Sequence, residues 1–364
     1  MNENEILGFN PQDLTVFNQE ENSSRNFNSN IYHTRPIDAK SDDGIYRATI
    51  KIIYNPFDLR QSILEQQSYG LQDSVGWFSV ISSLTINDTS CPIFKAWKKC
   101  HYAEKGSSLW KQAASIDEGG KALFDKRFAR YVTIQVIEDK NQPELNGKYM
   151  LWKLPKSIWD TINTKMKPSP ESKKASIPVM DFLFGRSFDL EVTPGPGNPN
   201  DPRYKRETKY LGELSEDVVS CTYPDGSPLL NDDEQEVLDT YVSAVQKIWK
   251  NKDPEERARM TNELNEDPNT IKLREIYSKV IEIIKGFCPN LIDELSYKPW
   301  TDEIKTRVQN WIDVVLSGGD PAASENVPDQ ILNPNVANSV GNETSKNVEV
   351  PVAKETDDTD DLPF

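Results

Sequence analysis

The chain has 364 residues, a net charge of -16 and a pI near 4.8, with 36% hydrophobic and 9% aromatic residues. This length predicts about two domains, and the apolar content is sufficient for a packed core. Four cysteines in so long a chain do not make a disulfide framework. No apolar run is typical of a signal peptide or a membrane span, so we expect a cytosolic protein without a membrane partner.

Charge is distributed unevenly along the chain. Residues 31–215 carry 27 Lys/Arg against 22 Asp/Glu, and residues 95–174 carry 17 against 9. Residues 317–364 carry 10 Asp/Glu and 2 Lys. A basic middle with acidic flanks is typical of a DNA-binding protein whose own tail competes with DNA. The alternative is an acidic protein with a locally basic loop region.

The first part of the chain predicts a polar arm followed by a strand. Residues 1–30 are rich in Asn and acids, which predicts a mobile arm. A strand should begin near Tyr46, because apolar residues alternate there with Arg47, Thr49 and Lys51. Residues 94–123 favour helix and loop, broken at Gly119-Gly120.

A basic and aromatic hairpin is predicted in residues 125–162. Val132, Ile134 and Val136 alternate with polar or aromatic residues, which indicates a strand. Asn146-Gly147 marks a tight turn, a second strand follows over 148–154, and 157–163 favours a short helix. The alternation leaves open whether Tyr149 and Lys153 or Lys148 and Trp152 face outward.

The residue types of this hairpin suit single-stranded nucleic acid. Cations neutralise phosphates, and aromatic faces stack on unpaired bases. The stretch contains the cations Lys126, Arg127, Arg130, Lys140, Lys148, Lys153 and Lys156 and the aromatics Phe128, Tyr131, Tyr149, Trp152 and Trp159. The alternative is an ordinary half-exposed hairpin with Trp152 in the core, since aromatic residues favour strands in any case.

The order of these parts resembles the single-stranded DNA-binding proteins of T-even-like phages. A basic-aromatic lead-in precedes an apolar strand, an acidic loop with Pro143, the Asn146-Gly147-Lys148 turn, an aromatic-basic strand and the helix start at Lys156. The resemblance covers about residues 45–215. It implies an OB-type β-barrel core that binds single-stranded DNA without strong sequence preference.

The resemblance also implies which residues contact DNA. The base-contacting aromatic positions fall on Tyr131 and Trp152, and the basic ones on Lys126, Arg127 and Lys153. The predicted DNA-binding set is Lys126, Arg127, Arg130, Tyr131, Lys148, Trp152, Lys153, Lys156, Tyr204 and Arg206. Further candidates are Tyr102, Trp110, Phe128, Lys205 and Tyr210.

Two features of that family are missing from this sequence. The family core holds a structural zinc through one His and three Cys, but those positions fall here on Tyr69, Ser82, Cys91 and Phe94. We therefore expect no cofactor and an apolar replacement for zinc, although Cys91, Cys100 and His101 leave a metal site open. The family's basic N-terminal arm is acidic here, which puts cooperative binding by that route in doubt.

Periodicity becomes helical after residue 230. Apolar residues recur at three- and four-residue steps within residues 231–316, which predicts a small helical bundle. The bundle would serve self-association or partner binding. The predicted organisation is α+β, with a mobile arm over 1–30, an OB-type core over 31–215, a helical region over 216–317 and a disordered acidic tail over 318–364.

The acidic tail resembles the tip of bacterial single-stranded DNA-binding proteins. It ends in acids followed by Leu-Pro-Phe, and in that family the terminal Phe docks on replication and repair proteins. The resemblance implies recruitment of replication and recombination proteins, against the alternative of a solubilising tail. The predicted partner-binding residues are Asp360, Asp361, Leu362, Pro363 and Phe364.

Catalytic signals are poor. The chain has two histidines, no phosphate-binding GxxxxGK loop and no HExxH helix. We therefore expect that the protein is not an enzyme. We expect that it acts in DNA replication, recombination and repair in the cytoplasm of an infected bacterium. The alternatives are a virion or assembly protein that uses an OB-like barrel for protein contacts, and an RNA-binding protein.

Overall fold

The structure is a computed structural model that describes residues 30–34, 40, 44–167, 177–194, 208–251 and 253–323. Apart from residue 30 and residues 318–323, the predicted arm and tail lie outside these residues. The strands are β1 (Ile31–Tyr32), β2 (Tyr46–Ile53), β3 (Leu64–Asp73), β4 (Gly76–Ile81), β5 (Asp125–Asp139), β6 (Tyr149–Leu154), β7 (Arg186–Pro194) and β8 (Thr208–Val218). The α-helices are α2 (Pro92–His101), α3 (Ser108–Ala113), α4 (Lys156–Met166), α5 (Asp232–Lys250), α6 (Pro254–Glu266), α7 (Pro268–Lys285), α8 (Leu291–Leu295) and α9 (Asp302–Leu316). Short 3-10 helices are η3 (Leu59–Gln61), η4 (Ser83–Ile86), η5 (Ile116–Glu118) and η6 (Pro143–Leu145).

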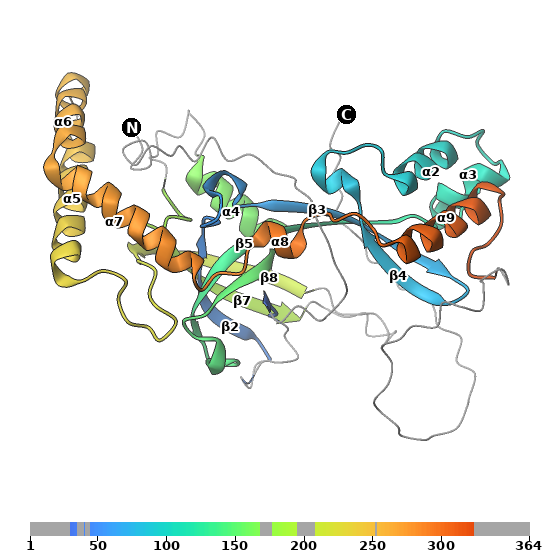
Figure 1. Cartoon of the computed structure of the whole chain (residues 1–364), viewed down its shortest axis with the longest axis horizontal. Helices are drawn as coiled ribbons and strands as arrows, with labels where there is room; N and C mark the ends of the chain where they lie inside the picture. Colours follow the sequence, from blue (N-terminus) through green and yellow to red (C-terminus); the bar gives the residue numbers. More distant parts are fainter. Residues whose placement is uncertain are drawn as a thin grey trace.

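The described strands form one mixed sheet of eight, and β5 holds it together. The sheet runs in the order β1-β6-β5-β2-β7-β8, and β3 joins it by pairing with both β4 and β5. The C-terminal part of β5 pairs with β2 and β6, whereas its first seven residues, Asp125 to Tyr131, pair with β3. The fold is therefore mixed α and β, as predicted, with β3 and β5 linking two groups of elements (Figure 1).

A first core fills the inner face of β2, β5, β6 and β7. Strict alternation on these strands sends every second side chain to that face, where α4, α5 and α7 cover it. Helix α7 is bound to the core by Tyr277, whose hydroxyl donates to Asp181 Oδ2 at 2.9 Å. The buried members include Ile50, Ile52, Val132, Ile134, Val136, Trp152, Ile158, Phe188, Leu190, Tyr241 and Val280.

Lys51 departs from the predicted alternation. The pattern of β2 places it outward, but its side chain is completely buried and its Nζ donates to the carbonyl of Val219 at 2.5 Å. Burial lowers the pKa of Lys51, because the charged form loses its hydration. The prediction was wrong because residues far along the chain cover this face of β2.

A second core lies at the other end of β3. Tyr69, Leu71, Phe78 and Val80 pack there against α2, α3 and α9. Helix α9 is secured by Arg307, which makes two hydrogen bonds with Asp73, at 2.6 and 2.9 Å, and lies 3.9 Å from the centre of the Phe78 ring. The Nε1 of Trp311 donates to the carbonyl of Gln72 at 2.9 Å.

Only part of residues 231–316 forms the helical bundle that the sequence predicts. Helices α5, α6 and α7 pack on one another and join the first core, whereas α9 belongs to the second core and α8 packs on the opposite face of the sheet against Leu64 and Leu151. The helical stripes themselves were correct, since Leu273, Ile276 and Val280 are buried as expected. Each stripe is an amphipathic face that needs a partner: α5 and α7 pack on each other, and α9 packs on α2 and α3.

Candidate nucleic-acid interface

The first half of β5 presents its side chains on two faces. Alternate residues of a strand point in opposite directions, so Lys126, Phe128 and Arg130 share one face and Arg127 and Tyr131 share the other. The first face continues into the first core beneath α4, and we call it the α4-side face. The second carries Tyr131 against α8, and we call it the α8-side face.

Cations and rings are arranged in a row on the α4-side face. The guanidinium carbon of Arg130 lies 5.0 Å from the centre of the Phe128 ring and 5.9 Å from that of Trp159 on α4. Phe128 is 40% exposed, and Lys126 is exposed two residues further along β5. We call Lys126, Phe128, Arg130 and Trp159 the basic-aromatic row. Lys126 and Arg130 are four residues apart, which is about 14 Å along a strand.

Helix α4 adds a further cation beside the row. Lys156 and Trp159 are three residues apart on α4, a spacing that places side chains on one side of a helix. Lys156 is exposed and Trp159 half-buried. The helix is fixed by Ile158 and Ile162 in the first core, and Ser157 Oγ donates to the carbonyl of Tyr210 on β8 at 3.0 Å. The predicted residues Lys126, Arg130 and Lys156 are therefore brought to one side of the sheet.

The α8-side face holds the other predicted residues of this stretch. Arg127 is exposed, but its Nε donates to Asp125 Oδ2 at 2.8 Å. Tyr131 is half-buried against α8, and burial raises its pKa. Lys153 on β6 is directly opposite Tyr131 and is exposed. These residues do not join the row, because the strand separates them from it.

Trp152 requires a correction. It lies opposite Val132 in the first core, and only 2% of it is exposed. A base cannot stack on a ring whose faces are covered, so in this structure Trp152 is a core residue and not a DNA contact. The alternation predicted that either Tyr149 and Lys153 or Lys148 and Trp152 face outward, and neither alternative is correct. One residue of each pair is exposed, namely Lys153 and Lys148, and Tyr149 and Trp152 are buried.

Lys148 lies far from the row. The carbonyl of Lys148 accepts from Val136 N, six residues along β5 from Arg130, which corresponds to about 20 Å. The neighbouring Gly147 has a φ of +82°, and a Cβ there would meet the carbonyl of Pro224 at 2.1 Å. The predicted turn is therefore confirmed, but it places Lys148 at the opposite end of the sheet. Tyr204 and Arg206 lie outside the described residues, as do Asp360 to Phe364.

Two members of the row were underrated from sequence. Phe128 was a secondary candidate, and Trp159 was one of many aromatics in the stretch. The sequence places Phe128 two residues from both Lys126 and Arg130, and this period of two would have grouped the ring with the two cations. Trp159 could not be placed this way, because its position depends on how α4 packs.

The positions that correspond to zinc ligands in the resembled family do not fit a zinc ion. Of Tyr69, Ser82, Cys91 and Phe94, only Cys91 is a Cys or His, whereas a structural site needs four such ligands. The Ser82 hydroxyl donates to Cys91 Sγ at 3.2 Å within the second core. Cys100 is buried nearby, but His101 is exposed and stacks on Trp97 at 4.7 Å between ring centres. No group of three His, Cys, Asp or Glu residues suits a metal within the described part of the chain.

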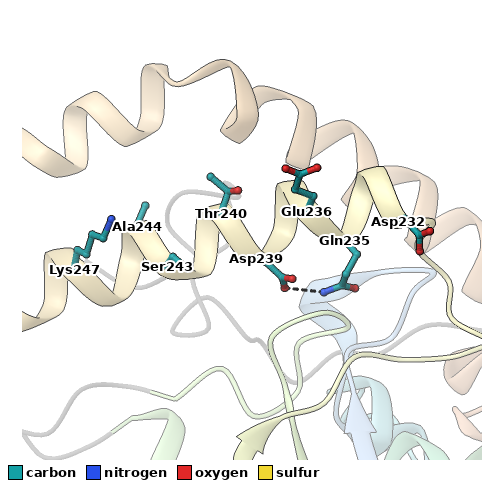
Figure 2. A pocket seen from close by; sticks show the side chains of 8 residues that line it. All are labelled: Asp232, Gln235, Glu236, Asp239, Thr240, Ser243, Ala244 and Lys247. Atoms are coloured by element: carbon teal, nitrogen blue, oxygen red, sulfur yellow. Dashed lines mark hydrogen bonds between the residues drawn. The ribbon is translucent and has the colours of Figure 1, made fainter.

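A hollow on the described surface lies along α5 and has a different character. It measures ≈ 570 Å³, and Figure 2 shows its lining, which includes a hydrogen bond of 2.8 Å between Gln235 and Asp239. Its charged side chains are three acids and one lysine, so it does not attract phosphates. The lining residues are Asp232, Gln235, Glu236, Asp239, Thr240, Ser243, Ala244 and Lys247.

Comparisons with known proteins show that part of this chain is similar to phage DNA-binding proteins. Residues 68–237 match the family described as "gp32 DNA binding protein like". The single-stranded DNA-binding proteins of Enterobacteria phages T4 and T2 are each 24% identical to the chain over 168 residues, or 46% of this chain and 51% of theirs. The chain resembles the single-stranded DNA-binding proteins of T-even phages. The resemblance predicted from the sequence is thereby confirmed.

The matched region contains the whole basic-aromatic row. It begins within β3 and ends within α5, whereas the sequence alone suggested coverage of about 45–215. The chain spans about half the length of the curated relatives it matches.

Among the described residues, no helix has the length and apolar character needed to cross a membrane.

Proposed function

We propose that this protein binds single-stranded DNA across the basic-aromatic row without strong sequence preference. The observation that carries the proposal is the alternation of cations and rings, exposed or half-buried, on the α4-side face, within the region that matches the phage DNA-binding family. Lys126, Arg130 and Lys156 would contact phosphates, and Phe128 and Trp159 would stack on bases. The β strands of the first core would act as an OB-type barrel, which supports this kind of surface in many proteins.

Preference for single strands follows from the rings. Stacked bases of a duplex do not offer their faces, whereas unpaired bases can lie on an aromatic ring for roughly 1–3 kcal/mol each. Phosphate contacts alone would bind duplex and single strand alike. No catalytic step is part of the proposed role, which would serve replication, recombination and repair in the cytoplasm of an infected bacterium.

The proposal is tested by titrating fluorescently labelled oligo-dT with the full chain and measuring anisotropy at low and moderate salt. We expect binding that salt weakens, with much weaker binding of a duplex of equal mass. Equal affinity for oligo-dT and oligo-U would make the ligand single-stranded nucleic acid of either kind. Absence of binding to every nucleic acid, with the tail removed as well, would refute the proposal and favour an assembly role.

The row is tested against the α8-side face with matched pairs of variants. Lys126→Ala with Phe128→Ala changes the row, and Arg127→Ala with Lys153→Ala changes exposed residues of the other face. The row variant should lose far more affinity, although both variants lose positive charge. Equal losses would mean that general charge attraction, and not the row, binds the strand.

The acidic tail would have two roles in this proposal. The net charge of residues 317–364 supports competition with DNA for the row, and the terminal Leu-Pro-Phe supports recruitment of replication and recombination proteins. Removing residues 324–364 should tighten oligo-dT binding, chiefly at low salt where screening is weak. An unchanged affinity at low salt would remove the competition role and leave recruitment to be tested by pull-down with Phe364→Ala as the control.

A further inference from the structure

Arg130, the central cation of the row, already has an anionic partner. Its Nε donates to Glu65 Oε1 on the neighbouring strand β3 at 2.7 Å, and the two side chains are 23% and 28% exposed. Glu65 is directly opposite Arg130 in the β3–β5 pairing, so both lie on the α4-side face. The pair therefore forms part of the surface that the proposed function assigns to DNA.

The geometry of Arg130 is fixed from several sides. Phe128 and Trp159 contact its guanidinium through their rings, and Glu65 occupies its Nε. A guanidinium binds carboxylate and phosphate in the same planar manner, because both present paired oxygens to its N–H groups. Glu65 uses the Nε of Arg130, so a phosphate that binds across Nε and one Nη must take that donor from the carboxylate, and a phosphate in any position meets the negative charge of Glu65.

We propose that Glu65 occupies the phosphate site of Arg130 in the free protein and is displaced when single-stranded DNA binds. This inference rests on the proposed function and names a residue that limits it. Glu65 makes the row selective, because a ligand must supply enough phosphate and stacking contacts to replace the ion pair. Isolated phosphate, or a nucleotide too short to reach Lys126 and Phe128, would not displace it.

The direct test is Glu65→Gln, which keeps the size of the side chain and removes its charge. The variant should bind oligo-dT about two- to fivefold more tightly at low salt, in line with the strength of a partly exposed ion pair. Its salt slope should stay close to that of the unaltered protein, because Arg130 neutralises one phosphate in both complexes. Affinity is measured by anisotropy across a salt series.

Asp125→Asn is the matched control. Asp125 is an acid on β5 whose partner is also an arginine, Arg127, but this pair lies on the α8-side face. Both substitutions raise the net charge by one, and each frees one arginine of β5, Arg130 or Arg127, from its carboxylate partner. Asp125→Asn should change affinity less than twofold. If the two variants tighten binding equally, only the overall charge matters, and the inference is overturned.

A double-mutant cycle with Arg130→Gln excludes an indirect effect. When Arg130 is absent, Glu65→Gln should tighten binding no more than Asp125→Asn does, because there is no longer an ion pair for DNA to break. Weaker binding by Glu65→Gln alone would show that Glu65 positions Arg130 for the strand, which is the opposite of the inference. Circular dichroism of each variant verifies the fold.

The inference and the proposed function fail in different ways. If the unaltered protein does not bind oligo-dT, the proposed function is wrong. If it binds, and the row variant weakens binding while Glu65→Gln leaves the affinity unchanged, only the role of Glu65 is wrong.

Discussion

The ring of Phe128 provides the sharpest test of the interface, because the sequence and the structure assign base stacking to different residues. The sequence assigned base stacking to Tyr131 and Trp152, yet Trp152 is only 2% exposed, against 40% for Phe128. Phe128→Ala should weaken oligo-dT binding by roughly 1–3 kcal/mol, the usual value of one base on one ring. That range corresponds to about 5- to 150-fold in the dissociation constant.

Substitution of Phe128 should affect stability less than substitution of Trp152, whereas it should affect DNA affinity more. Phe128 buries only part of its ring, so its removal should lower the free energy of unfolding by no more than about 1 kcal/mol. Trp152 is enclosed by the first core, and even Trp152→Phe should cost about 1–3 kcal/mol by leaving a cavity. Urea unfolding measures the stability, and anisotropy with labelled oligo-dT measures the affinity.

Two further substitutions separate stacking from packing. Phe128→Tyr keeps an aromatic face and should retain most of the affinity. Phe128→Leu keeps an apolar side chain beside Arg130 but has no ring, and should bind nearly as weakly as the alanine variant. The reasoning is refuted if Trp152→Phe reduces affinity while Phe128→Ala does not, because base stacking would then require a ring that this structure buries.

Two other predictions concern charge. Arg130→Gln and Lys126→Gln should each lower the salt slope of oligo-dT binding by roughly 0.7, and Lys148→Gln should leave it unchanged; a slope that falls equally in all three would contradict the row. Asp73→Asn should destabilise the protein by about 2 kcal/mol near neutral pH by breaking the pair with Arg307. Although partial burial raises the pKa of Asp73, its bonds with Arg307 and two backbone amides lower it by more, so the stabilisation holds at neutral pH and is lost as pH falls through the lowered pKa. Urea unfolding at neutral pH and near pH 3 should therefore show the difference from the unaltered protein shrinking in acid, and a constant difference would exclude the ion pair as its cause.

Local periodicity predicted the elements well, because it reports which side of a strand or helix avoids water. The strand near Tyr46, the turn at Gly147 and the helix that contains Ile158 are all present. Periodicity did not predict what covers each face. Lys51 reads as outward on β2, but the segment around Val219 closes over it.

The same limit explains the errors in the candidate site. Residues 126–131 alternate, so the sequence could separate them into two sets. It could not decide that α8, more than 150 residues later, packs beside Tyr131. Nor could it show that Glu65 stands opposite Arg130, because strand register between β3 and β5 depends on the whole sheet.

The position of the row follows from the length of β5. Its α4-side residues from Val132 onward belong to the first core, and Lys126 is paired with Tyr69 at the start of the second. The row residues Lys126, Phe128 and Arg130 lie on the stretch of β5 between these two groups, and Phe128 is left partly exposed there. Because β5 is hydrogen-bonded to β3 along the row and enters the first core beyond it, a nucleic-acid strand that crosses the row would meet side chains already held in place, which lowers the entropy cost of binding.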